Sequence, residues 1–321
     1  MRRKYTRRPE LAGILNVNKP AGVTSHDVVA AIRRAARVRR VGHAGTLDPL
    51  ATGVLLVCLD QATRVSRYLV ASDKVYRAHI RLGQATDTDD AEGQVTHQQP
   101  PPAHLDAAAI EEALAGFVGQ IDQLPPRYAA IKRDGVPLYR LARQGLDPQP
   151  PPRQVVVHAI SLLTWHNPDL TVEVHCGPGT YVRALARDLG EQLGCGGHLA
   201  GLVRLRSGAF ALETATDLDR VLRRLQSPEG PGVADILWPV DAALTGLARM
   251  AIGAETEEQL RHGQQVAGPS PQPDEGQPAR RRVYAADGTL VAIARHDPGT
   301  GMWQPETVFD LRPAPERVRP S

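Results

Sequence analysis

The chain has 321 residues, of which 42% are hydrophobic and 23% are charged, and these proportions exclude a wholly disordered protein. The length allows a main domain and a smaller second one. The longest purely apolar run, Val54 to Leu59, is far shorter than the roughly 20 residues that a membrane helix needs. No apolar stretch follows the charged N-terminus, so neither a membrane span nor a signal peptide is expected.

Cysteines and charges narrow the class of protein further. Cys58, Cys176 and Cys195 are too few and too scattered for a disulfide framework, which indicates a cytoplasmic location. The net charge is only +3, but the cations cluster in a basic arm at residues 1–10 and again at residues 33–40. Both clusters suit contacts with a nucleic-acid backbone, and solvated surface is the other explanation for each.

The first expected helix follows residue 24. Ser25 is placed to cap it, and Gly42 to end it. Its apolar face consists of Val28, Val29, Ile32 and Ala36. Two further helices are expected, one where apolar residues recur at 110, 114 and 117, and one where leucines recur at 185, 189 and 193 before a glycine.

Strands are indicated by alternating apolar and polar residues. Residues 76–82 alternate, with Tyr76 heading the apolar face, and residues 169–176 do the same. Residues 154–164 are expected to pair with 169–176 as a hairpin. Because strands and helices do not follow one another in a regular βαβ series, the predicted fold class is α+β.

Beyond about residue 245 the chain becomes β-rich. One short helix is expected at 255–261, followed by a hairpin over 283–294 that turns at Asp287-Gly288. Prolines gather in three stretches that are expected to be exposed loops: 97–103, 148–153 and 268–278. Three arginines follow the last stretch and are expected to be free to meet phosphates: Arg280, Arg281 and Arg282.

The most unusual segment is residues 41–59, where three glycines, a proline and two threonines precede an apolar run. Asp48 is the only carboxylate in this segment, and Pro49 restricts its backbone. Its neighbours Leu47 and Leu50 are apolar, so they do not compete with the Asp48 carboxylate for polar contacts. From these local features Asp48 is either a turn-forming residue or a partly desolvated functional acid.

Five segments, in this order and at these spacings, resemble the TruB family of tRNA pseudouridine synthases: 13-GILNVNKPAGVTSHDVV-29, 41-VGHAGTLDPLATGVLLV-57, 73-DKVYRAHIRLGQATDTDDAEG-93, 125-PPRYAAIKRDGVPLYRLARQG-145 and 177-GPGTYVRALARDLG-190. The resemblance covers most of residues 10–245, and five ordered segments make it specific. It implies the pseudouridine synthase fold, with a mixed, mainly antiparallel sheet and flanking helices. A small PUA-like β-barrel is expected to follow.

The resemblance also implies a domain division. Residues 1–245 correspond to the pseudouridine synthase catalytic domain, with the basic arm at 1–10. Residues 246–316 correspond to a PUA-like RNA-binding domain, into which the proline-rich stretch 268–278 is inserted. As an alternative, this tail only shields apolar surface of the main domain.

The family's reaction detaches uracil from its ribose at N1, turns the base and reattaches it through C5, at the T-loop uridine at position 55 of tRNA. The rearrangement transfers neither electrons nor phosphate, so no cofactor is expected. The sequence also lacks a P-loop and a dinucleotide-binding glycine fingerprint. Asp48 in GTLDP matches the family's essential aspartate. Attack on C1′ and assistance to a glycal route both stay open as its role.

An ionised aspartate buried against a base needs a cation, because loss of water raises its pKa. Arg183 matches the family arginine that pairs with the aspartate, whereas its position alone suggests an exposed helix arginine. Tyr76 matches the family tyrosine that stacks on the flipped uracil and helps to remove the C5 proton. A core tyrosine is the alternative.

The target base lies inside a folded RNA loop and must be extruded. His43 matches the family's candidate for a side chain that enters this loop, and a structural histidine bonded to a carbonyl is the alternative. Lys19 is expected to serve the site or a phosphate, or to be a surface lysine with its stem on apolar surface. Tyr181, Leu202 and Lys132 are further candidates for contacts with RNA.

No metal site is expected. The acidic run at residues 87–92 misses the EF-hand spacing and is interpreted as a solvated loop. A second candidate metal set consists of His175, Cys176, Cys195 and His198. It contains no CxxC pair, and Cys176 fits the apolar alternation of its strand.

Together the residues and the resemblance predict a tRNA pseudouridine synthase that acts as a monomer on the T stem-loop, without cofactor, membrane or protein partner. A guide-RNA-dependent synthase of the related dyskerin branch is less consistent with the segment 125–145 and the short tail. A non-catalytic RNA-binding or tRNA-folding protein on the same fold is the alternative from another class. An Asp-nucleophile phosphotransferase lacks a second carboxylate of the DxDxT kind.

Overall fold

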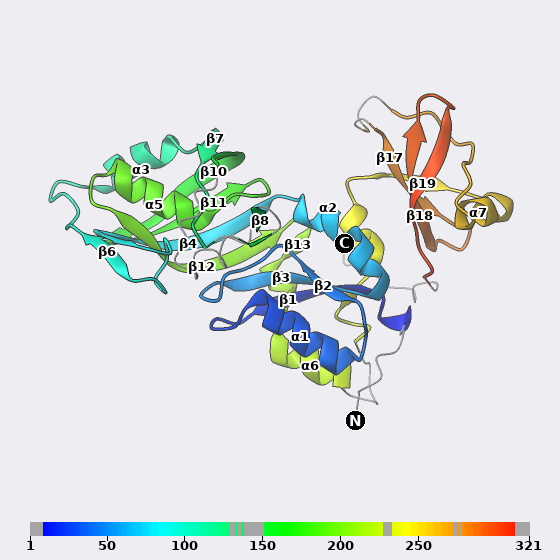
Figure 1. The fold of residues 1–321 in the computed structure, drawn as a ribbon, viewed down its shortest axis with the longest axis horizontal. Helices are drawn as coiled ribbons and strands as arrows, with labels where there is room; N and C mark the ends of the chain where they lie inside the picture. The colour runs from blue at the N-terminus through cyan, green and yellow to red at the C-terminus, as the bar shows by residue number, and fades with distance from the viewer. Residues whose placement is uncertain are drawn as a thin grey trace.

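The computed structural model describes residues 9–128, 132–133, 136–137, 151–226, 233–272, 275 and 278–311. Figure 1 shows a long molecule in which one large sheet runs through two lobes, and a smaller β-rich lobe made from the end of the chain lies beside them. No helix in the described part is long and apolar enough to cross a membrane.

The large sheet has eleven strands, and eight of them form its main path in the order β14-β1-β3-β12-β4-β11-β10-β7. The strand bounds are β1 Gly13–Lys19, β2 Val41–Ala44, β3 Thr52–Leu59, β4 Lys74–Leu82, β7 Gly119–Gln123, β10 Arg153–His166, β11 Asp169–Cys176, β12 Gly197–Ser207, β13 Phe210–Ala211, β14 Thr216–Asp217 and β15 Leu237–Trp238. Only β1–β14 and β3–β12 are parallel pairs among the described strands of this sheet. The predicted mixed, mainly antiparallel sheet is therefore confirmed.

Helices flank both halves of this sheet (Figure 1). α1 (Ser25–Ala36) and α6 (Leu218–Gln226) lie side by side against the half that contains β1 and β3, while α3 (Ala107–Ala115) and α5 (Val182–Gln192) cover the half that contains β4 and β11. The remaining elements are short: 3-10 helices at Pro9–Leu11, Asp60–Val65, Leu212–Thr214 and Val240–Leu244, α2 (Ser66–Val70), and two small hairpins, β5 (Gln84–Thr86) with β6 (Val95–Gln98) and β8 (Lys132–Arg133) with β9 (Val136–Pro137).

The start and end of α1 differ from the prediction. Thr24, not Ser25, is the N-cap: its hydroxyl accepts from the Asp27 backbone N–H at 3.1 Å, and the Asp27 carboxylate accepts from the Thr24 N–H at 3.1 Å. The helix ends at Ala36, well before Gly42, because Arg37 adopts a left-handed conformation with φ 54°. Ser25 is thereby left free for the contact with Leu47 described below.

The other element predictions hold more closely. α3 ends at Ala115, so the apolar residue at 117 lies outside it. α5 ends at Gln192, so the last leucine of its pattern, Leu193, is the C-cap just before the expected glycine stop. β4 buries alternate residues, and β10 and β11 form the expected hairpin. The stretch 97–103 is partly wrong as a loop, since its first two residues belong to β6.

The two halves of the large sheet meet along a short seam between β3 and β12. Only two Cα pairs join these strands, Val203 with Thr52 and Arg204 with Gly53. Gly53 has φ +95°, and a Cβ atom on it would lie 2.3 Å from the Arg204 carbonyl oxygen. Glycine is therefore required at this seam for both its backbone conformation and its lack of a side chain.

The C-terminal lobe contains α7 (Ala254–Arg261) and a four-stranded sheet in the order β16-β17-β18-β19. Its strands are β16 Ala248–Ala251, β17 Arg280–Tyr284, β18 Leu290–Asp297 and β19 Met302–Val308. The expected helix and the hairpin turning at residues 287–288 are confirmed. Across the described residues the strand order is open, so the lobe is a small sheet without a closed barrel, and it is consistent with the expected PUA-like domain.

This lobe shares a hydrophobic core with the rest of the chain. Four of its buried side chains belong to the same cluster as Ile14 and Leu56 of the large sheet: Tyr284, Leu290, Ile293 and Phe309. The Tyr284 hydroxyl also donates to the Asp241 carboxylate at 2.8 Å. The shared core supports the alternative in which the tail covers apolar surface.

Ending the chain after Thr245 is therefore expected to destabilise the remaining domain. Each apolar side chain that loses its burial contributes about 1.5 to 3 kcal/mol, and the truncation exposes several at once. We expect a lower melting temperature by circular dichroism, or insoluble protein. A soluble truncated chain that melts at the full-length temperature would show that the shared core contributes little.

The three arginines expected to be free for phosphates are largely engaged within the lobe. Arg281 is 4% exposed, pairs with Glu275 and lies over the Trp303 ring at 4.7 Å. Arg280 forms two hydrogen bonds with Glu306, at 2.9 and 3.1 Å. The prediction is thus wrong for Arg281, because a nearby carboxylate and an aromatic ring neutralise and cover its guanidinium.

Candidate active site

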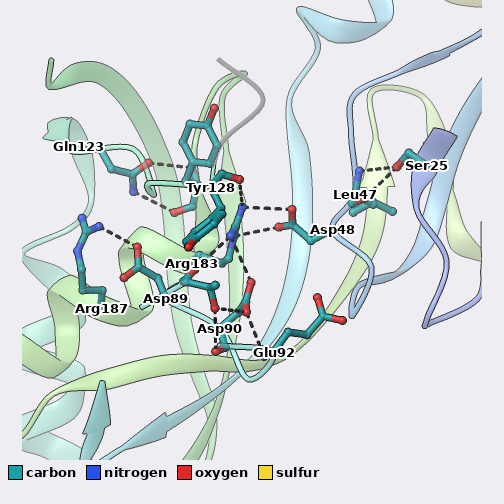
Figure 2. A network of polar contacts seen from close by, with 12 residues as sticks. Ser25, Leu47, Asp48, Asp89, Asp90, Glu92, Gln123, Tyr128, Arg183 and Arg187 are labelled. Carbon is teal, nitrogen blue, oxygen red and sulfur yellow. Dashed lines mark hydrogen bonds and ion pairs between the residues drawn. The ribbon is translucent and has the colours of Figure 1, made fainter. Parts of the chain in front are cut away.

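Asp48 lies in the loop between β2 and β3, and three earlier residues hold this loop in place: Ser25, Gly22 and Lys19. The Ser25 hydroxyl donates to the Leu47 carbonyl at 2.9 Å and accepts from the Leu47 N–H at 2.8 Å (Figure 2). The Gly22 N–H donates to the Pro49 carbonyl at 2.9 Å. The segment at the start of α1 therefore fixes the backbone on both sides of Asp48.

Lys19, the last residue of β1, also holds this loop. It is fully buried, and its ammonium donates to the carbonyls of Pro20, Val23 and Pro49, at 2.8, 2.7 and 3.2 Å. Burial lowers the pKa of Lys19 to about 8. The alternative of a surface lysine is therefore wrong, and with three carbonyls engaging its three N–H groups the ammonium serves the Asp48 loop instead of a phosphate.

Arg183 and Asp48 point toward one another across the site (Figure 2). Nε of Arg183 lies 3.0 Å from Oδ2 of Asp48, and Nη2 donates to Oδ1 at 3.2 Å. The Arg183 side chain is 6% exposed, whereas that of Asp48 is 32% exposed. The pair is thus a two-point contact with the arginine inside and the carboxylate partly open to solvent.

A second carboxylate, Asp90, holds the other side of the Arg183 guanidinium. Nη1 of Arg183 donates to Oδ2 of Asp90 at 3.2 Å and to the Thr88 carbonyl at 3.1 Å. The Thr88 hydroxyl donates to Oδ1 of Asp90 at 2.6 Å. Asp90 is 3% exposed, so the interpretation of residues 87–92 as a solvated loop is wrong at this position. A run of acidic residues gives no sign of which member a distant arginine will bury.

The N-terminus of α5, which carries Arg183, is fixed from two sides. Gln123 on β7 accepts from the Tyr181 N–H at 2.8 Å and donates to the Tyr181 carbonyl at 3.1 Å. One turn after Arg183, Arg187 pairs with Asp89 at 2.9 Å. Figure 2 shows both contacts beside the Arg183 network. The arginine therefore approaches Asp48 from a rigid helix end.

The electrostatics of Asp48 follow from this environment. Loss of water raises the pKa of its carboxyl above the ordinary value of 3.8, and the charge of Asp90 raises it further. Arg183 and Lys19 oppose this shift. Because an ionised Asp48 is the form that can attack or pair, activity is expected to fall as the pH drops through this raised pKa.

The single-turnover rate is therefore expected to have an acid limb with its midpoint above pH 3.8. Asp90→Asn removes a negative charge that raises the pKa of Asp48, so it is expected to move this midpoint to lower pH. Asp188→Asn, which removes a partner of Arg187, is the matched control and is expected to leave the midpoint unchanged. An upward shift in Asp90→Asn would contradict the assignment.

Tyr76 on β4 is 9% exposed and belongs to the main core cluster. Burial raises the pKa of its hydroxyl, and the nearby Arg204 guanidinium opposes the rise. Arg204 lies directly across from Tyr76 on β12 and is 1% exposed. Its guanidinium also donates to the carbonyls of Val54 and Gly45, at 2.6 and 3.1 Å.

Arg204 thus links the seam, the Asp48 loop and Tyr76, and the sequence reasoning missed it. The signal available was an arginine inside an apolar strand pattern, with Leu202 and Val203 before it and Leu205 after it. An arginine in such a pattern is either exposed to solvent or buried with partners for its charge. Its position opposite Tyr76 depends on strand pairing, which the local pattern does not specify.

His43 on β2 is partly buried, and burial together with the charge of Arg204 lowers its pKa. Its Nδ1 has no hydrogen-bond partner among the described residues, which argues against the carbonyl-bonded alternative for that nitrogen. Tyr181 caps α5, and loss of water around its hydroxyl raises its pKa. His43 lies in β2 beside β3, whereas Tyr181 lies at the start of α5, which covers the other half of the sheet.

The last two candidates are Leu202 and Lys132. Leu202 is 8% exposed on β12 and packs in the main core. Lys132 lies in β8, whose side chains are outside the described residues, as is most of the segment 129–150.

The four residues that the sequence offers as a zinc set do not assemble. Cys176 faces the core of β11 while the neighbouring His175 faces the other side, and the His198 ring lies 2.9 Å from the Gln84 carbonyl. Among the described residues, His175 instead meets Asp73 and His158.

The chain matches two family descriptions in succession. Residues 33–182 match "TruB family pseudouridylate synthase (N terminal domain)", and residues 183–245 match "tRNA pseudouridylate synthase B C-terminal domain". The boundary between the two matches falls at Arg183, the arginine that faces Asp48.

Two relatives of similar length are both named "tRNA pseudouridine synthase B". The chain is 41% identical to "tRNA pseudouridine synthase B" of Dehalococcoides mccartyi over 95% of this chain and 98% of that protein. It is 42% identical to the protein of the same name from Xanthomonas campestris pv. campestris (strain B100), over 97% of both.

A solved structure agrees on the fold. The chain resembles one in "Crystal Structure of a Cbf5-Nop10-Gar1 Complex" with a TM-score of 0.72 and 26% identity, over 97% of this chain and 90% of that one. The full-length relatives decide the membership, and the chain belongs to the TruB family of tRNA pseudouridine synthases.

Proposed function

We propose that this chain converts the T-loop uridine at position 55 of tRNA into pseudouridine, with Asp48 as the reacting carboxylate. The observation that carries the proposal is the two-point contact between Asp48, which is partly open, and Arg183, which is buried. Such a pair keeps a carboxylate ionised and aimed while leaving room for a base beside it. The relatives named tRNA pseudouridine synthase B support the substrate class.

In this reaction the N1–C1′ bond breaks, the uracil turns and a C5–C1′ bond forms. N1 gains a proton and C5 loses one, so the product is an isomer of the substrate. Asp48 either bonds to C1′ or assists glycal formation, and both routes need its ionised form. Arg183 holds the charge of Asp48 in place, with Asp90 fixing the arginine from behind.

Tyr76 is proposed to stack on the flipped base and to assist removal of the C5 proton. Because the pKa of Tyr76 is raised, its hydroxyl is neutral near pH 7, and the nearby positive charge of Arg204 is proposed to assist it. His43 is proposed to enter the space that the base leaves, and Tyr181 to line the same site. Leu202 and Lys132 are proposed to shape the site or to contact the RNA.

The direct test incubates the purified chain alone with a T stem-loop and maps pseudouridine by mass spectrometry. Pseudouridine at the T-loop uridine alone is the expected result. Binding without turnover would favour the non-catalytic RNA-binding or tRNA-folding alternative. Turnover only after a guide RNA is added would favour the dyskerin-type alternative.

We further propose that the chain acts as a monomer in the cytoplasm, without a protein partner. Residues 246–316 are proposed to bind RNA outside the T loop in addition to covering the main domain. Arg282, which remains partly exposed on β17, is the arginine of that group best placed for such a contact.

Catalysis is expected to survive exhaustive treatment with EDTA, because the rearrangement is redox-neutral and the proposed reacting groups are a carboxylate, an arginine and a tyrosine. A minimal stem-loop keeps the folding of the RNA from depending on magnesium. The measurement is the single-turnover rate before and after treatment. A loss of rate that zinc specifically restores would contradict this prediction.

A further inference from the structure

On the face of the large sheet away from α5, two histidines and a carboxylate meet. His175 lies on β11, His158 on β10, and Asp73 directly before β4. Nε2 of His158 is 3.3 Å from Oδ1 of Asp73, and Nε2 of His175 is 3.9 Å from Oδ2. One atom from each residue can be chosen so that all three lie within 4.8 Å of one another.

A β-bulge brings His158 into this group. The register of β10 against β11 shifts between Val157, which pairs with Cys176, and Ala159, which pairs with His175. His158 is the extra residue at this point, and a bulge of this kind re-aims the side chain that it carries. The two imidazole rings consequently lie 4.7 Å apart between centroids.

The group is separate from the proposed active site. Val174 and Cys176 on β11 face the core that contains Leu185 and Leu189 of α5, so His175 between them points to the opposite face. Tyr76 on β4 belongs to that core as well. The three side chains are 36 to 50% exposed, so an ion from solution can reach them.

We propose that Asp73, His158 and His175 form a binding site for a zinc-type divalent metal ion. Two imidazole nitrogens and one carboxylate oxygen are a ligand set that Zn²⁺ takes, with water in the remaining position. Zinc bonds of this kind place neighbouring ligand atoms about 3.4 Å apart. The three ligand atoms lie within 4.8 Å of one another, so each pair has to approach by at most about 1.4 Å to meet that geometry.

The local charges allow a cation at this place. Asp73 supplies one negative charge, and each imidazole binds metal in its neutral form. Lys74 follows Asp73 in the chain, but it is 6% exposed and its ammonium donates to the carbonyls of Leu69 and Val70. A bound ion would tie β10 and β11 to the start of β4, close in sequence to Tyr76, and so act as a brace without touching the reacting groups.

The test uses full-length protein without a histidine tag, stripped with EDTA and then titrated with ZnCl₂ by calorimetry and with CoCl₂ by visible absorption. We expect one saturable equivalent, and a rise in melting temperature with zinc. His158→Gln and His175→Gln are each expected to lower the affinity about tenfold or more and to remove the rise.

The matched control is His79→Gln. His79 is an exposed histidine on β4 whose Nε2 lies 3.4 Å from Asp169, but no second histidine joins that pair among the described residues. This variant is expected to bind zinc as the wild type does. Asp73→Asn, with circular dichroism to confirm folding, is a further test of the site.

Equal zinc binding by wild type, His158→Gln and His175→Gln would overturn the proposal and leave two histidines sharing a carboxylate without a metal. Absence of saturable binding in the wild type would do the same. The rate of pseudouridine formation is measured separately, so the zinc titration does not depend on the proposed function.

Discussion

Asp48→Asn is expected to lower the single-turnover rate of pseudouridine formation by about 10³-fold or more while leaving RNA binding nearly unchanged. Asparagine keeps the size of the side chain but lacks the negative charge and one acceptor. Arg183 then loses part of its contact at Asp48 but keeps those with Asp90 and the Thr88 carbonyl. The variant should therefore fold, and the loss should lie in the chemical step.

The measurement compares saturated single-turnover rates and RNA affinity for wild type and variant. Asp169→Asn is the matched control, because Asp169 also makes a two-point contact with an arginine, Arg81, at 2.9 Å for both bonds, on exposed surface. Full activity is expected of it. If Asp48→Asn keeps about a tenth of the wild-type rate, Asp48 is not the essential group.

Gly53→Ala is expected to cause a large loss of stability. The residue has φ +95°, which strains any L side chain, and the added Cβ would lie 2.3 Å from the Arg204 carbonyl oxygen and 2.9 Å from its nitrogen. Both neighbours are backbone atoms and cannot rotate away. Strain and overpacking together are expected to cost about 3 kcal/mol or more.

Chemical denaturation followed by circular dichroism measures this loss. Gly42→Ala is the matched control, since a Cβ atom there would meet nothing within 4 Å and Gly42 has an ordinary φ. Its effect is expected to be within about 1 kcal/mol. Because the seam also positions Arg204, a folded Gly53→Ala protein should lose activity as well. Equal stability of the two variants would contradict the role assigned to the seam.

Much of the fold follows from local patterns. The alternation in β4 and β11 and the leucine spacing in α5 depend on neighbouring residues only, and the structure has these elements where the patterns indicate. The cap of α1 does not follow in this way. Thr24 and Ser25 are equally able to cap a helix, and the choice is made by Leu47, 22 residues away, which takes the Ser25 hydroxyl.

The site depends still more on distant contacts. Local features left Asp48 as either a turn residue or a functional acid, and only the family resemblance paired it with Arg183, 135 positions later. The sequence reasoning missed Asp90 and Arg204 because distant partners set their burial: Arg183 on α5 for Asp90, and the Val54 and Gly45 carbonyls for Arg204. An acidic run and a lone arginine in a strand both look like solvated surface until the sheet is assembled.

The place of β1 within the large sheet has a consequence for synthesis on the ribosome. One edge of β1 pairs with β3 soon after it is made, but the other edge waits for Thr216–Asp217 and Leu237–Trp238. At roughly 5 to 20 residues per second, about 10 to 45 s pass between the translation of Ile14 and that of its partner Trp238. During that interval an apolar strand edge stays uncovered, and such edges recruit other chains. Nascent copies on one polysome are therefore most exposed to mutual aggregation before residue 238 emerges, and a chaperone that covers β1 would act in that window.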